Sequence, residues 1–349
     1  MGGACAGEAA ALAEPGEIDT LVFVGSEGGG QPERMKGRKL FISTRDDLRG
    51  DGVPRLPAIR ANYEKAPEPK EEVILDGSAH AQFIFATEHR DRAMGEILRF
   101  VADARPSKRV IQSTILNEER NVVINLPLSY TNDLSKRYPV IYVLDGTSQD
   151  GPAAAVLAAL AASGEAPEAI VVGIPNTRGN RPRDQTPPFM KQEPDLAESK
   201  MGAGGEFLKF IKNELIPLVE KEYRTSSHRA FSGNSRGGLL VLYSLLEEPE
   251  LFQARFCFST PFHRQDTLIV NRTSEWLHDH RSLKSFFYMS VGTGETDNMK
   301  AGCENMKRLL HHQENNLVSH LDYIPNAGHS NNAALSYPGA LKKWAAFLK

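Results

Sequence analysis

The segment Ser232–Gly238, with the sequence SGNSRGG, has the residue types that a nucleophilic serine requires. It directly follows the apolar run HRAF and directly precedes the apolar run LLVLYSLL, which predicts a tight turn from a strand into a helix. Gly233, Ser235 and Gly237 fit the pattern G-x-S-x-G. Side chains at the glycine positions of so tight a turn would collide with neighbouring elements, and the serine must take a strained backbone conformation. A plain glycine-rich loop fits the same letters, but the flanking strand and helix favour a nucleophile.

A serine hydroxyl becomes a useful nucleophile when a base removes its proton and an acid orients that base. In strand-turn-helix serine sites the chain order is serine, acid, histidine, with the histidine after the last strand. His329, in NAGHSNN, follows the last strand-like run and is our candidate for the base. The competing interpretation is a turn histidine that is exposed to water and has no chemical role. Glu295 and Asp297 follow the run SFFYMSVG. We favour Glu295 as the acid and keep Asp297 as the alternative.

Backbone amides near the serine could bind the oxyanion that forms when an ester is attacked. The amide of Arg236 stands at the start of the predicted helix, where N–H groups and the helix dipole favour negative charge. A second amide should come from the turn after YPVIYVLDG, where Gly146 and Thr147 are the candidates. The same turn also fits an ordinary connection in which Asp145 caps the next helix.

A loop rich in proline and arginine, 176–188, offers side chains for an anionic substrate. Arg181 and Arg183 are our candidates, because the loop follows a predicted strand and ligands of open α/β sheets bind at the carboxyl ends of the strands. The competing interpretation is a solvated loop in which Arg183 forms a structural pair with Asp184.

Strand-like and helix-like segments alternate from about residue 106 onward, which is typical of a layered α/β sheet. Most predicted strands are continuous apolar runs, as parallel strands buried on both faces should be. The predicted strands are an opening antiparallel pair, 110–116 and 121–127, and then 138–146, 169–176, 228–235, 253–260, 285–292 and 320–325. The predicted helices are 152–163, 205–223 with a kink at Pro217, 237–248, 298–313 and 333–348, and the loops 185–203 and 261–283 should shape the pocket.

The composition of the 349-residue chain excludes several functional classes. With 40% hydrophobic and 24% charged residues it predicts an ordered globular protein. The formal net charge of −3 provides no overall attraction to nucleic acid or to an anionic membrane. The longest small apolar stretch, Ala153–Ala162, is about half of the roughly 20 residues that span a bilayer. We therefore expect neither nucleic acid nor membrane as a partner.

Metal and cofactor motifs are missing from the sequence. The three cysteines are widely spaced and form neither a zinc motif nor a disulfide framework, and no dinucleotide or P-loop fingerprint occurs. We expect no cofactor and no metal. The N-terminus has no basic segment and contains Glu8, so it does not resemble a secretory signal, and a cytoplasmic location is the expectation for the chain as given.

An internal repeat relates the first 105 residues to the end of the chain. KLFISTRDD resembles FFYMSVGTGE, VILDGSAH resembles DYIPNAGH, and the initial MGG resembles RGG at 236–238. Asp46 and His80 are separated by 34 residues, as are Glu295 and His329. Repeats on this scale indicate duplicated domains rather than a solenoid. We predict a partial unit at 1–105 and a complete domain at 106–349.

Residues 110–349 resemble the putative esterase family of the α/β-hydrolase superfamily, which includes enterobactin-type siderophore esterases, S-formylglutathione hydrolase and feruloyl or acetylxylan esterases. The matching pieces include ILNEERNVVINLP, YPVIYVLDG, VVGIPNTRGNRPRDQTPP, the serine turn and the GHS turn. The resemblance implies an α/β-hydrolase fold with a mostly parallel sheet and helices on both faces. It also implies a Ser–His pair supported by an acid, without a metal. One departure is Asn234-Ser235-Arg236, where the family leads us to expect His and a small or apolar residue around the serine.

Residues 1–105 resemble the C-terminal half of a dienelactone-hydrolase-like α/β hydrolase. Asp46, or else Asp47, and His80 fall on its acid and base positions, whereas the nucleophile and the earlier strands have no counterpart here. The resemblance implies the remnant of an upstream hydrolase domain that does not catalyse by itself. Its predicted strands, 21–26, 39–47 and 72–80, leave an unpaired edge, so we expect it to dock on the second domain or to mediate a homodimer.

These patterns together predict a serine carboxylic ester hydrolase that acts on a small-molecule ester through an acyl-enzyme. In this hypothesis Ser235 attacks the carbonyl, His329 is base and then acid, and Glu295 orients the imidazole. Siderophore-like esters and other small esters are both open as substrates. A peptidase or acyltransferase with the same triad is the alternative among enzymes. A non-catalytic binding protein on a hydrolase scaffold is the alternative outside them.

Overall fold

The computed structural model describes every residue except 1, 147, 178, 191–200, 281–283 and 312–316. The chain forms two compact units, unit 1 (Met1–Asp103) and unit 2 (Ala104–Lys349). The division lies two residues before the boundary predicted from the sequence repeat. Each unit has its own sheet and its own hydrophobic core.

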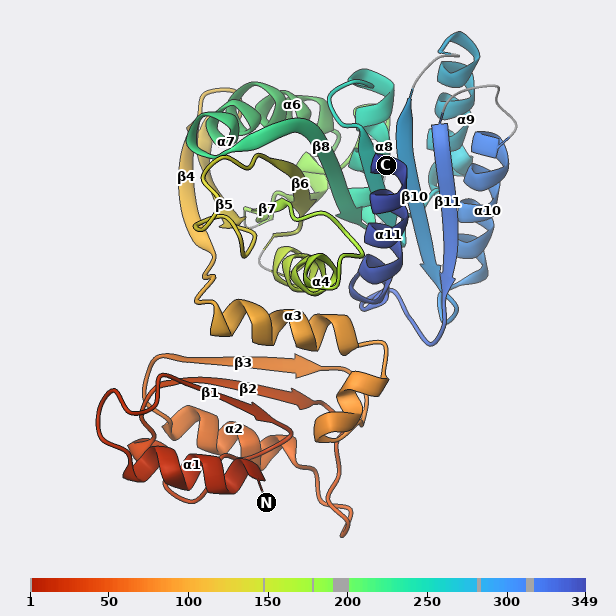
Figure 1. The fold of residues 1–349 in the computed structure, drawn as a ribbon. Helices are drawn as coiled ribbons and strands as arrows, with labels where there is room; N and C mark the ends of the chain where they lie inside the picture. The colour runs from red at the N-terminus through yellow and green to blue at the C-terminus, as the bar shows by residue number, and fades with distance from the viewer. Residues whose placement is uncertain (1, 147, 178, 191–200, 281–283, 312–316) are drawn as a thin grey trace. The chain divides into compact units, whose positions relative to one another are not determined.

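Unit 2 is built on a sheet whose described strands run in the order β11-β10-β9-β8-β6-β7-β5-β4 (Figure 1). The strands β6 to β11 pair in parallel, whereas β5 is antiparallel to both β7 and β4. The predicted opening antiparallel pair and the mostly parallel sheet are therefore confirmed. The strands are β4 (Ser107–Ser113), β5 (Glu118–Asn125), β6 (Tyr138–Leu144), β7 (Ile170–Ile174), β8 (Thr225–Asn234), β9 (Ala254–Phe258), β10 (Ser285–Gly292) and β11 (Leu317–Ile324).

Helices cover both faces of this sheet. Successive residues of β6 alternate between two cores, because the side chains of a strand point to opposite faces of the sheet. Ile141 and Val143 lie in the core beneath α4 and α11. Tyr142 and Leu144 lie in the core beneath α6, α7, α8 and α10. The helices are α4 (Asp150–Ala162), α5 (Arg181–Asp184), α6 (Gly204–Phe210), α7 (Ile216–Glu222), α8 (Arg236–Glu247), α9 (Arg264–Asp279), α10 (Asp297–His311) and α11 (Asn332–Leu348).

Two helical segments differ from the sequence prediction. The predicted helix 205–223 consists of α6, a π-helical turn (Ile211–Leu215) and α7, with Pro217 in the first turn of α7. Proline lacks the N–H that would continue the hydrogen-bond ladder, so the chain changes its helical register directly before it. The predicted loop 261–283 contains α9, which buries Ile269 and Leu277 against the core.

Unit 1 is a small α/β unit with three described parallel strands in the order β1-β2-β3. These strands confirm the three that were predicted. Phe23 and Phe41 pack on one face with α1 and α2, and Leu40 and Ile42 pack on the other face with α3. The elements are α1 (Gly2–Leu12), β1 (Thr20–Val24), η1 (Pro32–Arg34), β2 (Arg38–Thr44), α2 (Leu56–Lys65), β3 (Lys70–Leu75), η2 (Ala81–Ala86) and α3 (Arg90–Val101).

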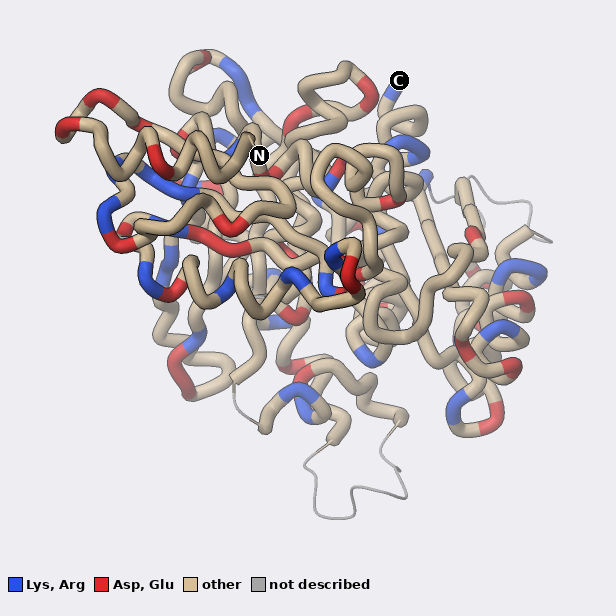
Figure 2. The backbone as a smooth tube through the Cα atoms, turned by 90° about the horizontal axis from the view of Figure 1, so that it is seen from below, with Lys and Arg blue, Asp and Glu red and all other residues tan. Residues whose placement is uncertain are grey.

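Charged residues are distributed along the whole chain. In the view of Figure 2, Lys and Arg alternate with Asp and Glu along the backbone tube. None of the helices in the described ranges combines the length and the apolar character that crossing a membrane requires.

A partly buried hydrogen bond joins β8, which leads to Ser235, to α11, which follows His329. The indole N–H of Trp344 on α11 donates to Nε2 of His228 on β8 over 3.0 Å. Burial, together with the nearby charge of Arg229, lowers the pKa of His228 to about 4. A protonated imidazole cannot accept this hydrogen bond, so the folded state requires the neutral form.

We expect the stability that this contact provides to be lost as the pH falls. The unfolded pKa of histidine is about 6.5, so the contribution is complete above that pH and declines as the pH falls toward the folded pKa of about 4. His228→Gln retains an acceptor but does not titrate. Melting temperatures measured across this range should fall less steeply in His228→Gln than in the wild type, and parallel curves would contradict the assignment.

Candidate active site

Ser235 stands in a strained turn between β8 and α8. Its backbone has φ 55° and ψ −119°, in the left-handed region that non-glycine residues rarely adopt. A Cβ at Gly233 would lie 2.4 Å from the backbone carbon of Gly237, and one at Gly238 would lie 1.8 Å from Oγ1 of Thr260. A Cβ at Gly237 would have no neighbour closer than 3.4 Å. The turn therefore needs Gly233, as predicted. Its second obligatory glycine is Gly238 rather than Gly237, because Gly238, at the start of α8, packs directly against Thr260, which follows β9.

The structure brings together the three residues proposed as a triad. Oγ of Ser235 lies 2.9 Å from Nε2 of His329. On the other side of the ring, Nδ1 of His329 lies 2.9 Å from Oε2 of Glu295. The three residues follow β8, β11 and β10, so they meet because the carboxyl ends of parallel strands share one edge of the sheet.

Glu295 is buried and receives three hydrogen bonds. Besides the imidazole, the hydroxyl of Ser259 donates to its Oε1 over 2.6 Å and the amide of Gly292 donates to the same oxygen over 2.9 Å. Burial alone would raise the pKa of Glu295, but the hydrogen bonds from His329, Ser259 and Gly292 outweigh it and hold the pKa below its ordinary value. The side chain is therefore an anion that can stabilise a protonated imidazole.

Ser259 belongs to a buried polar network that sequence reasoning did not identify. It follows β9, is fully buried and has a positive φ of 45°. The amide of Asn332 donates to Oγ of Ser259 over 2.9 Å and to Oγ of Ser290 over 3.0 Å, and the hydroxyl of Ser336 donates to Ser290 over 2.7 Å. These four residues connect α11 to β9 and β10 beneath Glu295. No local motif marks them, since their contacts are distant in sequence.

Asp297, the alternative acid, lies away from the imidazole. It is the first residue of α10, its side chain is fully exposed, and its Oδ1 lies 3.7 Å from Nζ of Lys300. The geometry selects Glu295 because the turn after β10 directs that side chain back toward the sheet, where it bonds to the amide of Gly292.

The three predicted oxyanion groups have three different outcomes. Arg236 is the first residue of α8, so its amide lies at the positive end of the helix dipole. Gly146 is a correction, because its N–H donates to the carbonyl of Ile174 over 3.0 Å and is thus engaged in the sheet. A Cβ at Gly146 would lie 2.5 Å from the nitrogen of Ile174, so glycine is needed there for close backbone approach. The third candidate, Thr147, lies outside the described residues.

Arg181 and Arg183, the candidates for an anionic substrate, both form ion pairs within unit 2. Arg181 makes two bonds to Asp145, of 2.7 and 2.8 Å, and a third of 3.1 Å to the carbonyl of Asn234, the residue before the nucleophile. Arg183 bonds to Glu118 and to Asp184, each at 2.6 Å. The pairing of Arg183 with Asp184 was the competing interpretation. Arg181 therefore ties the turn after β6 to the serine turn, and a contact of either arginine with a substrate stays a prediction.

Metal ligands do not gather at this site. Within the ranges that the structure describes, no group of three or more His, Cys, Asp or Glu side chains is placed to hold a metal ion. The chemistry available to Ser235, His329 and Glu295 is nucleophilic attack with proton transfer.

Residues 113–347 match the model of the family described as "Putative esterase". The chain is 31% identical over 189 residues to ferri-bacillibactin esterase BesA of Bacillus subtilis, covering 49% of this chain and 64% of that protein. The solved IroE-like serine hydrolase from Shewanella oneidensis has a TM-score of 0.60 and 25% identity, over 69% of this chain and 80% of that one. The enterobactin esterase FES from Shigella flexneri, solved in the presence of enterobactin, has a TM-score of 0.54 and 20% identity, over 69% of this chain and 59% of that one.

These likenesses define unit 2 as an α/β hydrolase of the esterase class. Because the family model matches more than half of the chain, the chain belongs to the putative esterase family. The alignment spans less than two thirds of the length of BesA, and unit 1 lies entirely outside the family match.

Replacement of the two acids after β10 should separate their roles. Glu295→Gln keeps the size of the side chain but removes the charge that stabilises the imidazolium, so we expect kcat for an activated ester to fall about a thousandfold or more. Asp297→Asn should leave kcat within about twofold, since the side chain is exposed. Steady-state kinetics of both purified variants test this assignment, and a large loss in Asp297→Asn would contradict it.

Loss of the hydroxyl of Ser259 should raise the pKa of Glu295. We expect Ser259→Ala to lower kcat about tenfold, the effect of losing one hydrogen bond to a charged group. Since the folded pKa moves up, activity should also begin to decline at a higher pH as the solution is acidified. The control is Ser163→Ala, a serine of unit 2 outside this network, whose hydroxyl bonds to Leu160 and Glu165. Identical pH profiles for Ser259→Ala and the control would contradict the role of Ser259.

Proposed function

We propose that unit 2 is a serine esterase that hydrolyses small carboxylic esters through an acyl-enzyme on Ser235. The observation that carries the proposal is the unbroken series of hydrogen bonds from buried Glu295 through His329 to the hydroxyl of Ser235, each of 2.9 Å. Family membership supports ester hydrolysis as the reaction. The strained backbone of Ser235 further supports it, because strain of this kind is concentrated at functional sites.

The reaction follows from the positions of these atoms. As Oγ of Ser235 adds to the ester carbonyl, Nε2 of His329 accepts the hydroxyl proton and Glu295 stabilises the resulting imidazolium. The developing oxyanion is placed toward the amide of Arg236 at the positive end of α8. His329 then returns the proton to the departing alcohol. Water, deprotonated by the same imidazole, releases the acid and restores Ser235.

Siderophore esters are our first candidates for the substrate. The relative BesA is named a ferri-bacillibactin esterase, and the similar structure of FES was solved in the presence of enterobactin. Small aryl and feruloyl esters are the comparison substrates, because a ferulic acid esterase has the same fold. Relative kcat/KM values for enterobactin, a feruloyl ester and p-nitrophenyl butyrate would rank these classes.

The proposal requires that Ser235 be the nucleophile. An organophosphonate should add its mass to the peptide that contains Ser235 and abolish hydrolysis of p-nitrophenyl acetate. Ser235→Ala should escape this label and lose about a thousandfold or more in kcat. The matched control is Ser148→Ala, an exposed serine near the same edge of the sheet, which should still be labelled at Ser235. A folded wild-type protein that is neither labelled nor active on any of these esters would contradict the proposal.

A further inference from the structure

Unit 1 repeats the last part of unit 2 in three dimensions. The helix α1 followed by the parallel strands β1-β2-β3 corresponds to α8 followed by β9-β10-β11. A Cβ at Gly3 would lie 2.1 Å from Oγ of Ser26, just as one at Gly238 would lie 1.8 Å from Oγ1 of Thr260. The start of α1 therefore presses on the end of β1 in the same way that α8 presses on the end of β9.

The acid and the base of unit 2 have counterparts at the same edge of the unit 1 sheet. Nδ1 of His80, after β3, lies 2.7 Å from Oδ2 of Asp47, after β2. The acid is thus Asp47 and not Asp46, which the equal spacing in the sequence favoured. The side chain of Asp47 is only 3% exposed, and Arg55 lies 3.5 Å from its other oxygen. A buried carboxylate that bonds to Nδ1 fixes the imidazole so that Nε2 faces outward.

His80 lines a cavity of about 720 Å³. The glycines at the start of α1 and the end of β1 line the same cavity, together with Ser26 and Arg55. The side chain of His80 is 40% exposed, and within the described part of the chain no hydrogen-bond partner of its Nε2 is found. The dyad is therefore accessible to a small molecule.

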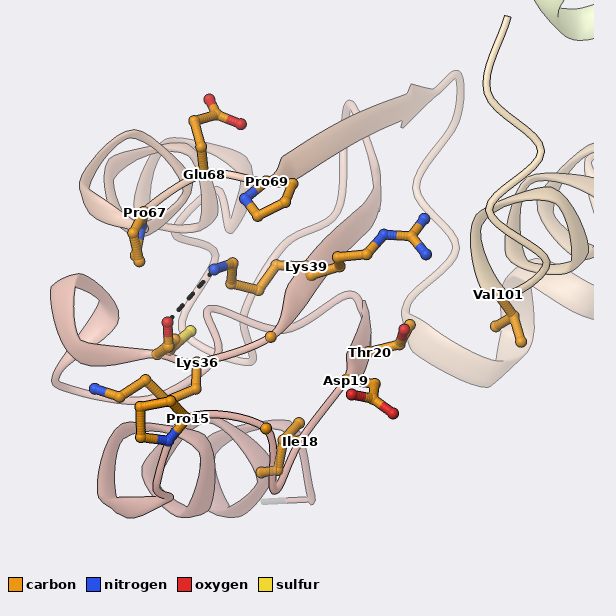
Figure 3. Close-up of a pocket in the computed structure, with 14 residues that line it drawn as sticks. Pro15, Ile18, Asp19, Thr20, Lys36, Lys39, Pro67, Glu68, Pro69 and Val101 are labelled. Carbon is orange, nitrogen blue, oxygen red and sulfur yellow. Dashed lines mark hydrogen bonds between the residues drawn. The ribbon is translucent and has the colours of Figure 1, made fainter.

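A second cavity of unit 1, of about 650 Å³, lies at the amino ends of the strands and has a different character (Figure 3). Its buried residue Lys39 donates from Nζ to the carbonyl of Met35 over 3.4 Å, as the dashed line shows. Burial lowers the pKa of Lys39. Among the described residues that line it, no acid is hydrogen-bonded to a base, so this cavity does not offer the same chemistry.

We propose that His80 and Asp47 form a second acid-base site, which hydrolyses small, activated carboxylic esters in the cavity of unit 1 with water as the nucleophile. Nε2 of His80 removes a proton from water while the water oxygen adds to the ester carbonyl. When the tetrahedral intermediate collapses, the bond to the alcohol oxygen breaks and the imidazolium returns the proton to it, which yields acid and alcohol. Without a covalent intermediate, the reaction is slower than that of Ser235. The sequence led us to expect an inactive remnant, whereas the retained dyad and cavity favour slow turnover.

The experiment measures the residual hydrolysis of p-nitrophenyl acetate by the full-length Ser235→Ala protein, after organophosphonate treatment to remove contaminating serine esterases. Adding His80→Gln or Asp47→Asn should lower this residual rate about tenfold, because general-base catalysis is lost. Adding His278→Gln, an exposed histidine of α9, is the matched control and should leave the rate unchanged. Because His329 can still deprotonate water in Ser235→Ala, the test proteins and the control also carry His329→Gln. The outcome therefore does not depend on the function proposed for unit 2.

The residual rate of the protein that carries Ser235→Ala and His329→Gln should also be slower in D2O, since a proton of water moves in the rate-limiting step. Equal rates in H2O and D2O would overturn the proposal even if the variants at His80 and Asp47 failed to fold. Folded His80→Gln protein, as judged by circular dichroism, that hydrolyses the ester as fast as the control would overturn it as well.

Discussion

The backbone of Ser235 is the constraint on which the rest of the site depends. A positive φ at a serine costs about 1–3 kcal/mol, so the surroundings must hold it. The amide of Ser235 donates to the carbonyl of Phe258 over 2.8 Å, and the amide of Gly238 donates to the carbonyl of Ser235 over 2.9 Å. Together with the close approach of Gly238 to Thr260, these bonds fix the end of β8 and the start of α8 against β9. The hydroxyl of Ser235 is thereby directed at His329.

Ionisation of Glu295 is the second requirement, and it is met by hydrogen bonding rather than by exposure. A buried carboxylate tends to take up a proton, which would prevent it from stabilising an imidazolium. Ser259 and the amide of Gly292 reverse that tendency at one oxygen, and His329 does so at the other. Asn332 on α11 in turn holds Ser259. The helix α11, which packs on the sheet, therefore also positions the hydroxyl of Ser259 that keeps Glu295 ionised.

The residues that could be predicted are those whose role depends on local sequence or on chain order. The serine turn is visible as a strand, glycines and a helix, and His329 and Glu295 follow the last strands in the expected order. Gly146 was misassigned because its amide pairs with the carbonyl of Ile174, a partner distant in sequence. The ion pair of Arg181 with Asp145 is likewise a contact between distant residues that the sequence does not reveal. The helix α9 was missed although its buried Ile269 and Leu277 recur at helical spacing, because the segment was interpreted as a loop between two strands.

The central claim is that the fold holds Ser235 in a strained conformation that aims it at both His329 and the end of α8. A crystal structure of the organophosphonate adduct tests this claim most directly. The account predicts phosphorus bonded to Oγ of Ser235, a positive φ retained at that residue, Nε2 of His329 still within hydrogen-bonding distance, and a phosphonyl oxygen accepting from the amide of Arg236. An adduct on another residue, or a Ser235 that has relaxed to negative φ with its hydroxyl turned away from His329, would contradict it.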